Sequence, residues 1–357
     1  MRAMMAPTKN KKAEASMPRF SSLAFIVAAA ALASPCGPAA AQDGVAEFYN
    51  GKTIRLFVGL PPGGGADAYA RVVQRHIGRY IPGNPTVVAQ STPGAGSLRS
   101  VMALNAADTD GTAMVHFSSG LLTQALTAPD RVKVDFRSYA FIGNVSEDVR
   151  VCYLRSGAGV RNWAEMIAHK QGVIFAGSAA GTAGNANIAM LRNLFGVPLK
   201  IVQGYAGSAA KRLAIERGEV FGDCGGWTSV PEDWLSEKKI NVMVRLSPTL
   251  LPGMDKSVPF AGDLVKTADE RRIYDLLNAP ERLGRLFMVA GSVPQDRVAA
   301  LRKAFDAMVG DATFRAEAEK AKLTVTPMTG QEVTRQIAEV YATPAPLIAK
   351  AKAIVAE

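Results

Sequence analysis

Short apolar runs alternate with amphipathic stretches along almost the whole chain, and this alternation constrains the fold more than any other feature. The stretch from Asp67 to Tyr80 is typical of the amphipathic segments, because Ala70, Val73 and Ile77 fall on one face of a helix. The pattern predicts an α/β fold with mostly parallel sheets flanked by helices. The runs expected to form strands are 54–58, 86–89, 112–117, 150–154, 173–176, 199–202, 219–223, 241–246 and 285–290.

The first 41 residues have the composition of a cleaved export signal. A segment with five Lys or Arg residues precedes the short apolar run Leu23–Ala33, and an A-x-A cleavage site ends at Ala41. An apolar run of this length falls short of the ~20 residues needed to span a bilayer. The sequence therefore predicts a signal peptide over residues 1–41, cleaved near Ala41, and an exported mature protein. Whether the chain starts at Met1 or Met17 stays open.

The mature chain would be mildly basic and large enough for two domains. Removal of 41 of the 357 residues leaves 316, which suffices for two separate cores. The leader contributes +4 of the formal charge of +10, and aromatic residues make up only 7% of the chain. Without a basic run interleaved with aromatic residues, this composition argues against nucleic-acid binding and suits a small anionic ligand.

Residues that could carry catalysis or bind a metal are scattered. His76, His116 and His169 each lack a second His or a Cys at ligand spacing, so no metal site is expected. Residues 116–120 are similar to the G-x-S-x-G nucleophile motif but lack its first Gly, so the Ser118 hydroxyl is expected to cap a helix or face a ligand. The sequence therefore predicts neither an enzyme nor a cofactor.

Two cysteines, Cys152 and Cys224, remain after removal of the leader. Both lie in or beside expected strands, and an oxidising compartment allows cysteines to pair. The sequence does not place them within bonding distance, so the presence of a disulfide stays open.

Two glycine-rich turns near the front of the chain follow expected strands and open helices. They are Pro61–Asp67, after the run 54–58, and Pro93–Ser97, after the run 86–89. Such a turn directs backbone N–H groups and the positive end of a helix dipole at one place, where an anion can bind. Neither turn has the Lys and Ser or Thr of a P-loop, so a carboxylate is the expected ligand. The alternative is that the glycines only permit tight turns.

Two further turns of this kind occur in the middle of the chain. Gly177–Asn185 resembles a loose dinucleotide-binding motif, but the acidic residue expected about twenty residues later is missing. Its small hydroxyl groups beside free N–H groups suit an oxyanion equally well. Gly204–Ser208 also follows an expected strand, and its alternative interpretation is a core Tyr205 beside a helix cap.

The order of these turns resembles the extracytoplasmic receptors of tripartite tricarboxylate transporters, the Bug family of solute-binding proteins. The resemblance implies a two-lobed, periplasmic-binding-protein-like fold of type II topology. Residues 42–149 and 286–357 would form lobe 1, and residues 150–285 would form lobe 2. Two crossing segments, near Arg150–Leu154 and Arg285–Val289, would form the hinge, and the chain from Pro294 onward would pack on lobe 1. The matching segments are Phe48–Lys52, Pro61–Arg71, Pro93–Gly96, Gly177–Thr182, Tyr205–Gly207 and Val293–Pro294.

The resemblance also implies a ligand site between the lobes that holds a small organic carboxylate. The implied contacts are Gly63, Gly64, Gly65, Asp67, Ser91, Gly94, Ala95, Gly96 and Ser97 in lobe 1 and Ser178, Thr182, Tyr205 and Gly207 in lobe 2. The Asp67 carboxylate would repel such a ligand, so its expected role is to brace the first helix. The chain departs from the family's usual residues at Leu60, Ser91, Ser97 and Ala206. A basic residue is usual at the last of these, so the contact of the ligand's far end is not predicted.

The function implied by the resemblance is that of a periplasmic receptor. It would act as a monomer, without cofactor or metal, and deliver its carboxylate to integral membrane transporter subunits. One alternative is an exported binding module that reports to a sensor or chemoreceptor. Another is an exported α/β enzyme, which would need a nucleophile with a base, or a metal cluster. The identity of the carboxylate stays open.

Overall fold

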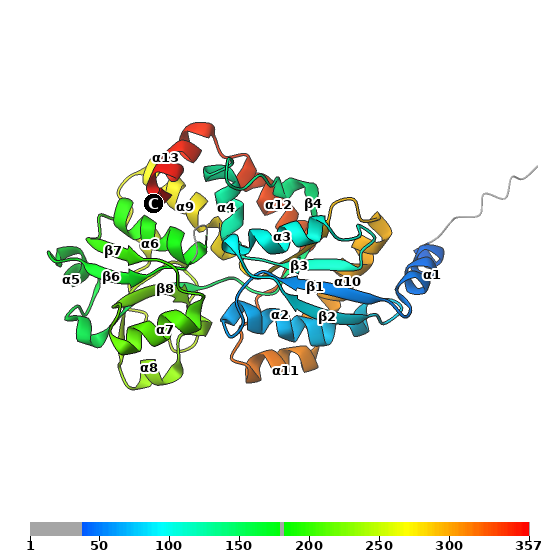
Figure 1. Cartoon of the computed structure of the whole chain (residues 1–357), viewed down its shortest axis with the longest axis horizontal. Coiled ribbons are helices and arrows are strands. Elements are labelled where there is room, and N and C mark those ends of the chain that lie inside the picture. Colours follow the sequence, from blue (N-terminus) through cyan, green and yellow to red (C-terminus); the bar gives the residue numbers. More distant parts are fainter. Residues whose placement is uncertain (1–37, 179–181, 357) are drawn as a thin grey trace, which may run out of the picture. The chain divides into compact units, whose positions relative to one another are not determined.

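The computed structural model describes residues 38–178 and 182–356, which build two sheets with helices on both faces of each (Figure 1). The first sheet has six strands in the order β11-β4-β10-β3-β1-β2, and the second has five in the order β7-β6-β8-β5-β9. We call each sheet with its helices a lobe. Most of the expected signal peptide lies outside the described residues, and the expected cleavage site at Ala41 falls within helix α1 (Pro38–Tyr49).

Each apolar run that predicted a strand overlaps an observed strand, whereas β4 and β11 were not expected. The first sheet contains β1 (Thr53–Val58), β2 (Thr86–Ser91), β3 (Ala113–His116), β4 (Tyr139–Asn144), β10 (Leu286–Ala290) and β11 (Met328–Thr329). The second contains β5 (Arg150–Arg155), β6 (Val173–Ala176), β7 (Leu199–Val202), β8 (Gly222–Gly226) and β9 (Ile240–Arg245).

The sheets are mixed: most strands of each sheet run in one direction, as expected, but β10 and β11 in the first sheet and β5 in the second run against the others. Strand β1 pairs parallel with β2 and β3, and β6 pairs parallel with β7 and β8. In contrast, β10 pairs antiparallel with β3 and β4, β11 with β4, and β5 with β8 and β9. The connections between the lobes explain these directions, because the chain enters β5 and β10 from the other lobe. Strand β5 therefore begins beside the end of β8, and β10 begins beside the end of β3, so each runs antiparallel to that neighbour.

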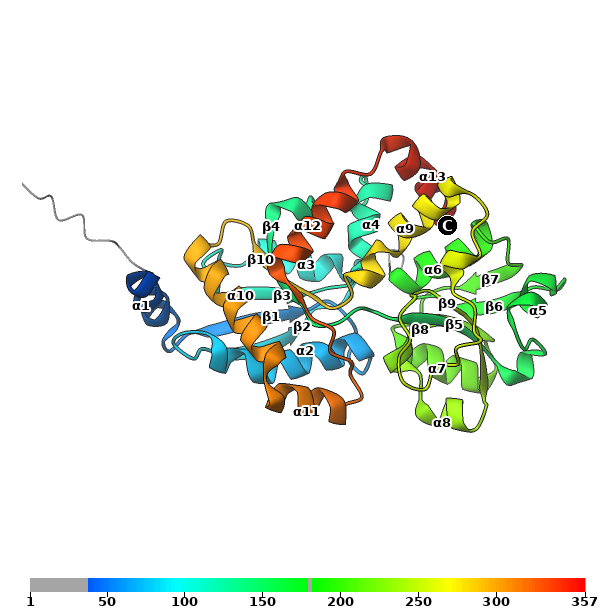
Figure 2. The same ribbon diagram turned by 180° about the vertical axis from the view of Figure 1, so that it is seen from behind.

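Alternating side chains give the first sheet two apolar faces, and helices cover both of them (Figures 1 and 2). Ile54, Leu56 and Val58 point to one face, and Phe57 and Val115 point to the other. The first face packs against α2 (Gly65–His76), α10 (Gln295–Gly310) and α11 (Ala312–Lys320). The second packs against α3 (Leu98–Asn105), α4 (Gly120–Thr127) and α12 (Gly330–Tyr341).

The second sheet is covered in the same way. Cys152, Phe175 and Val244 point to one face, and Val151 and Tyr153 point to the other. The first face packs against α5 (Trp163–Ala168), α6 (Ala183–Asn193), α9 (Ala268–Arg282) and α13 (Ala345–Val355). The second packs against α7 (Ser208–Arg217) and α8 (Glu232–Ser236). No helix in the described parts of the chain is long and apolar enough to cross a membrane.

Within the described residues, the chain passes between the lobes at three places rather than the two expected. The first two are residues 145–149, between β4 and β5, and residues 283–285, between α9 and β10. The segments expected to cross, which became β5 and β10, are interior strands that follow these crossings. The third is residues 342–344, because α13 packs against α6 and α9 of the second lobe. The expectation that the whole chain after Pro294 packs on the first lobe is therefore wrong for α13: an apolar helix face does not specify which core buries it.

Backbone hydrogen bonds join the first two crossing segments. The Val145 N–H donates to the Arg285 carbonyl at 3.1 Å, and the Arg285 N–H donates to the Ser146 carbonyl at 3.0 Å. Gly284 is required at this place, because its φ is +28° and a Cβ would lie 2.1 Å from the Ser146 carbonyl oxygen. The two segments therefore form one paired element between the lobes.

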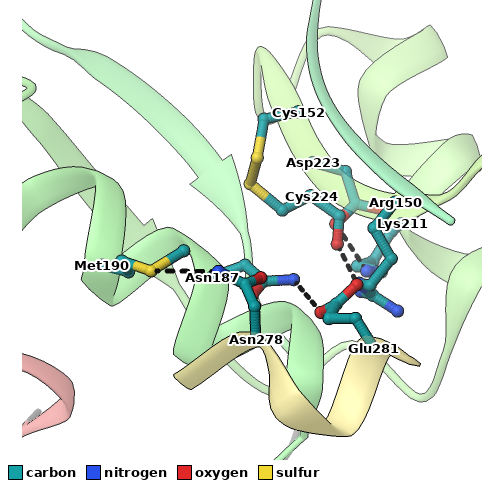
Figure 3. Close-up of a disulfide and its surroundings, with 9 residues drawn as sticks. All are labelled: Arg150, Cys152, Asn187, Met190, Lys211, Asp223, Cys224, Asn278 and Glu281. Atoms are coloured by element: carbon teal, nitrogen blue, oxygen red, sulfur yellow. Dashed lines mark hydrogen bonds and ion pairs between the residues drawn. A yellow bond between two sulfur atoms is a disulfide. The ribbon is translucent and has the colours of Figure 1, made fainter. Parts of the chain in front are cut away.

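Strand register settles the question of the disulfide. Cys152 on β5 lies directly opposite Cys224 on β8, and the two are joined by a disulfide across 72 positions of sequence (Figure 3). Facing positions of an antiparallel pair bring Cβ atoms close enough for such a bond.

Candidate ligand-binding site

A cavity of about 610 Å³ lies between the lobes, at the edge where β1, β3 and β6 end. In open α/β sheets this carboxyl edge is the usual place for a ligand. The first lobe contributes the loops that follow β1, β2 and β3, and the second contributes the loops that follow β6, β7 and β8. Asp148, Arg150 and Arg285 contribute from the crossing segments and the strand start beside them.

The N-termini of helices from both lobes line this cavity. The first turn of a helix leaves N–H groups without partners inside the helix and carries the positive end of its dipole. An anion in the cavity would therefore face the positive ends of several helices at once. The lining residues at these ends are Gly64–Asp67 of α2, Ser118 and Ser119 before α4, Thr182–Gly184 of α6, and Gly207 and Ser208 of α7.

Most of the residues expected in the site line the cavity, and three do not. Among the described residues, Gly63 lines a neighbouring groove of about 980 Å³ instead, and Ser91 and Ala95 are exposed to solvent. Ser91 ends the edge strand β2, and Ala95 lies at the tip of its turn. The expected residues that line the cavity are Gly64, Gly65, Asp67, Gly94, Gly96, Ser97, Ser178, Thr182, Tyr205 and Gly207.

Asp67 lies in the first turn of α2 and is buried. One oxygen of its carboxylate accepts the Gly63 N–H at 3.3 Å, and the other accepts the Arg71 Nε–H at 3.3 Å. The carboxylate thus holds the first glycine turn in shape and is partly neutralised by Arg71. These contacts support the bracing role that the sequence suggested.

The glycines of the first turn also allow the two lobes to approach each other. A Cβ on Gly65 would lie 2.8 Å from Ser229 Oγ and 3.2 Å from Thr228 Oγ1 of the second lobe. The Gly65 N–H donates to Ser229 Oγ at 3.3 Å, and Lys322 of the first lobe forms an ion pair with Glu232 of the second. From the sequence, these glycines were expected either to supply N–H donors or to permit a tight turn. In the structure Gly65 also lies at a close contact between the lobes.

The second glycine turn is held by a serine side chain. Gly94, Ala95, Gly96 and Ser97 all have positive φ, at 139°, 45°, 63° and 82°. The Ser97 hydroxyl donates to the Gly59 carbonyl at 2.9 Å and accepts the Ser118 N–H at 3.0 Å. These bonds tie together the loops after β1, β2 and β3 and stabilise a backbone conformation that alanine and serine rarely adopt.

Among the described residues, the cavity is also lined by three cationic side chains that were not expected in the site from the sequence: Arg150, Lys211 and Arg285. Arg150 and Arg285 share one carboxylate, that of Asp148, at 2.9 and 2.6 Å. Lys211 pairs with Asp223 at 2.5 Å, next to the disulfide (Figure 3). No local motif marks these cations: Arg285 and Lys211 meet their carboxylates only through contacts between separate segments, and the short spacing of Arg150 from Asp148 is common in sequences. They supply positive charge to the site, whereas Ala206, at a position where the family usually has a basic residue, supplies none.

Burial and neighbouring charges set the ionisation of this cluster. Burial opposes the ionisation of Asp148, but Arg285 and Arg150 outweigh it and hold the pKa of the carboxyl below its usual range. Burial raises the pKa of Glu281 to about 8, although Arg150 lies 3.4 Å away and the Asn187 amide donates to it at 2.7 Å. The two arginines therefore share the Asp148 carboxylate, whose ionised form they favour, whereas burial favours the neutral form of Glu281.

Beside the site, His116 ends β3, with its ring stacked on Phe287 and its Nδ1 bonded to the Leu286 carbonyl at 2.8 Å. Burial lowers the pKa of His116 to about 4. The unfolded chain then binds a proton that the folded chain does not, so stability falls as the pH drops from 6.5 toward 4. Because of this residue, we expect the free energy of unfolding to fall by about 2 kcal/mol when the pH is lowered from 7 to 5.

Urea unfolding of the unaltered protein and of His116→Phe at the two pH values measures this difference. The variant should lose less stability on acidification than the unaltered protein, and His169→Phe serves as the control. Equal losses in the unaltered protein and His116→Phe would show that His116 does not cause the effect.

Comparison with known proteins identifies the fold. No family model and no curated protein sequence matches the chain. A TctC solute-binding protein from Polaromonas superposes with a TM-score of 0.62 at 20% identity, covering 85% of this chain and 99% of that one. The periplasmic binding protein BugD gives 0.69 at 18% identity, with 85% and 98% covered. MatC from Rhodopseudomonas palustris with bound malate gives 0.67 at 15% identity, with 85% and 99% covered. The chain thus has the two-lobed α/β fold of the TctC and Bug solute-binding proteins.

Proposed function

We propose that this protein is a periplasmic receptor that captures a small organic carboxylate between its lobes and delivers it to the membrane subunits of a tripartite tricarboxylate transporter. The observation that carries the proposal is the cavity, where helix N-termini from both lobes and the cationic side chains of Arg150, Lys211 and Arg285 surround one space. The malate bound to MatC, a protein of the same fold, supports the choice of ligand class.

In this proposal the chain is exported, loses its signal peptide near Ala41, and acts as a monomer without a cofactor. The ligand contacts are the lining residues of the glycine turns together with Ser178, Thr182, Tyr205 and Gly207. Lobe 1 would comprise residues 42–149 and 286–344, and lobe 2 would comprise residues 150–285 together with α13. We assign no catalytic role to Ser118, because the neighbouring His116 is buried and bonded to a backbone carbonyl.

A thermal-shift series with the mature protein, beginning at Gln42, tests the proposal. Malate, succinate, adipate and citrate are compared with neutral sugars and amino acids at matched ionic strength. We expect at least one carboxylate to raise the melting temperature and to give saturable binding by calorimetry. The absence of binding by every carboxylate would contradict the proposed function. Uptake of the bound carboxylate by cells with and without the receptor then separates a transport role from a sensory one.

A further inference from the structure

We propose that Arg285 recognises a second anionic group of the ligand, so that the site selects dianions. The inference rests on the proposed function and concerns the part of the cavity that the crossing segments line. Its basis is the position of Arg285, the partners of its guanidinium and the partners of the other two cations.

The backbone of Arg285 is fixed in place. Its N–H donates both to Asn144 Oδ1 at 2.7 Å and to the Ser146 carbonyl at 3.0 Å. Gly284 before it admits no side chain, as described above. Arg285 therefore lies on the paired crossing segments that line the cavity rather than on a mobile loop.

The guanidinium of Arg285 is held firmly but has donors to spare. Its Nη2 donates to Asp148 Oδ1 at 2.6 Å, and its Cζ lies 5.2 Å from the centre of the Tyr69 ring. The side chain is 8% exposed, and among the described residues its buried Nε has no hydrogen-bond partner. A guanidinium has five N–H donors, and Asp148 takes one of them. A buried cation with unused donors beside a cavity is a strong site for an oxyanion.

Each of the other two cations of the cavity has a protein partner that Arg285 lacks. Arg150 donates to Asp148 Oδ2 at 2.9 Å and to the Cys224 carbonyl at 2.6 Å, and its Nε, which makes no hydrogen bond among the described residues, lies 3.4 Å from a Glu281 oxygen. Lys211 donates to Asp223 at 2.5 Å (Figure 3). Because Arg150 and Arg285 share Asp148, that carboxylate balances only part of the charge of Arg285.

The expected ligand therefore has two anionic groups. One would meet the N–H groups of the glycine turns, and the other would pair with Arg285, whose burial strengthens the interaction. A ligand whose second carboxylate is replaced by a neutral amide keeps its length and loses only this ion pair. The contribution of Arg285 to the affinity can thus be measured separately from that of the glycine turns, by comparing each dicarboxylate with its monoamide.

Calorimetric titrations with succinate and succinamate, and with adipate and adipamate, test the proposal. We expect the unaltered protein to bind the better-fitting dicarboxylate at least tenfold more tightly than its monoamide. In Arg285→Gln this preference should fall to within about threefold, while the affinity for the monoamide stays nearly constant. Arg282→Gln, an exposed arginine near the end of α9, is the matched control and should keep the preference.

The outcomes distinguish a failure of the proposed role of Arg285 from a failure of the proposed function. Equal weakening of dicarboxylate and monoamide in Arg285→Gln, or a preference that survives the substitution, would overturn the role of Arg285 but leave the proposed function standing. No binding of any of the four ligands or of malate and citrate by the unaltered protein would contradict the proposed function itself. If Arg285→Gln does not fold, Arg285→Met, which retains packing on Tyr69, is titrated with the same pairs and judged by the same criterion.

Discussion

Replacement of Cys152 and Cys224 together by Ala should lower the free energy of unfolding by about 4 kcal/mol. The disulfide closes a loop of 72 residues, and loop closure restricts the unfolded chain more strongly as the loop lengthens. The bond also joins two interior strands of the second sheet, β5 and β8. Urea unfolding under oxidising conditions measures the loss.

Reduction supplies the control for this prediction. Dithiothreitol should lower the stability of the unaltered protein to near that of the double variant and leave the variant unchanged. Because both comparisons remove the same bond, any cavity left by the Ala side chains appears as the difference between them. Equal stability of the unaltered protein before and after complete reduction would contradict the prediction.

Gly65→Val should weaken carboxylate binding by more than a hundredfold, which corresponds to about 2.7 kcal/mol. Gly65 lines the cavity, and a Cβ there would lie 2.8 Å from Ser229 Oγ of the second lobe. Its φ is outside the positive range, so valine is compatible with the local backbone. The branched side chain should therefore hold the lobes apart without unfolding either of them. Calorimetry gives the affinity, and thermal unfolding shows whether the variant is folded.

Gly310→Val is the matched control for this substitution. Gly310 ends α10, and a Cβ there would have nothing within 4 Å. This variant should bind the carboxylate as the unaltered protein does. Unchanged affinity in a folded Gly65→Val would mean that the first glycine turn serves local structure only. Gly96 is less suited to such a test, because its φ of 63° strains any larger residue.

The sequence predicted the α/β architecture because apolar periodicity reports local structure directly. The runs at 54–58 and 173–176 became β1 and β6 within a residue, and each lies between helices as expected. Strand direction was not accessible in this way. It depends on where β5 and β10 enter their sheets, which is decided by the passage of the chain between lobes. For the same reason the sequence did not reveal that α13 packs on the second lobe.

The glycine turns were visible in the sequence because the motif and its function lie in one short segment. The cations were not, since Arg150 and Arg285 share Asp148 only after segments 137 positions apart have come together. Each arginine directly precedes an apolar run, which by itself is a common arrangement and no sign of a site. The pairing of Cys152 with Cys224 likewise required the register of β5 on β8.

The central claim is that the ligand is captured between the two lobes and draws them together, and small-angle X-ray scattering tests it most directly. The mature protein is measured alone and with a saturating concentration of the carboxylate that binds best in the thermal-shift series. The contacts of Gly65 with Ser229 and of Lys322 with Glu232 join the lobes in this structure, and a ligand held from both sides should favour the arrangement with the lobes together. We predict that the radius of gyration falls on saturation and that Gly65→Val shows no such fall. A radius of gyration that stays the same in the saturated, unaltered protein would contradict the account.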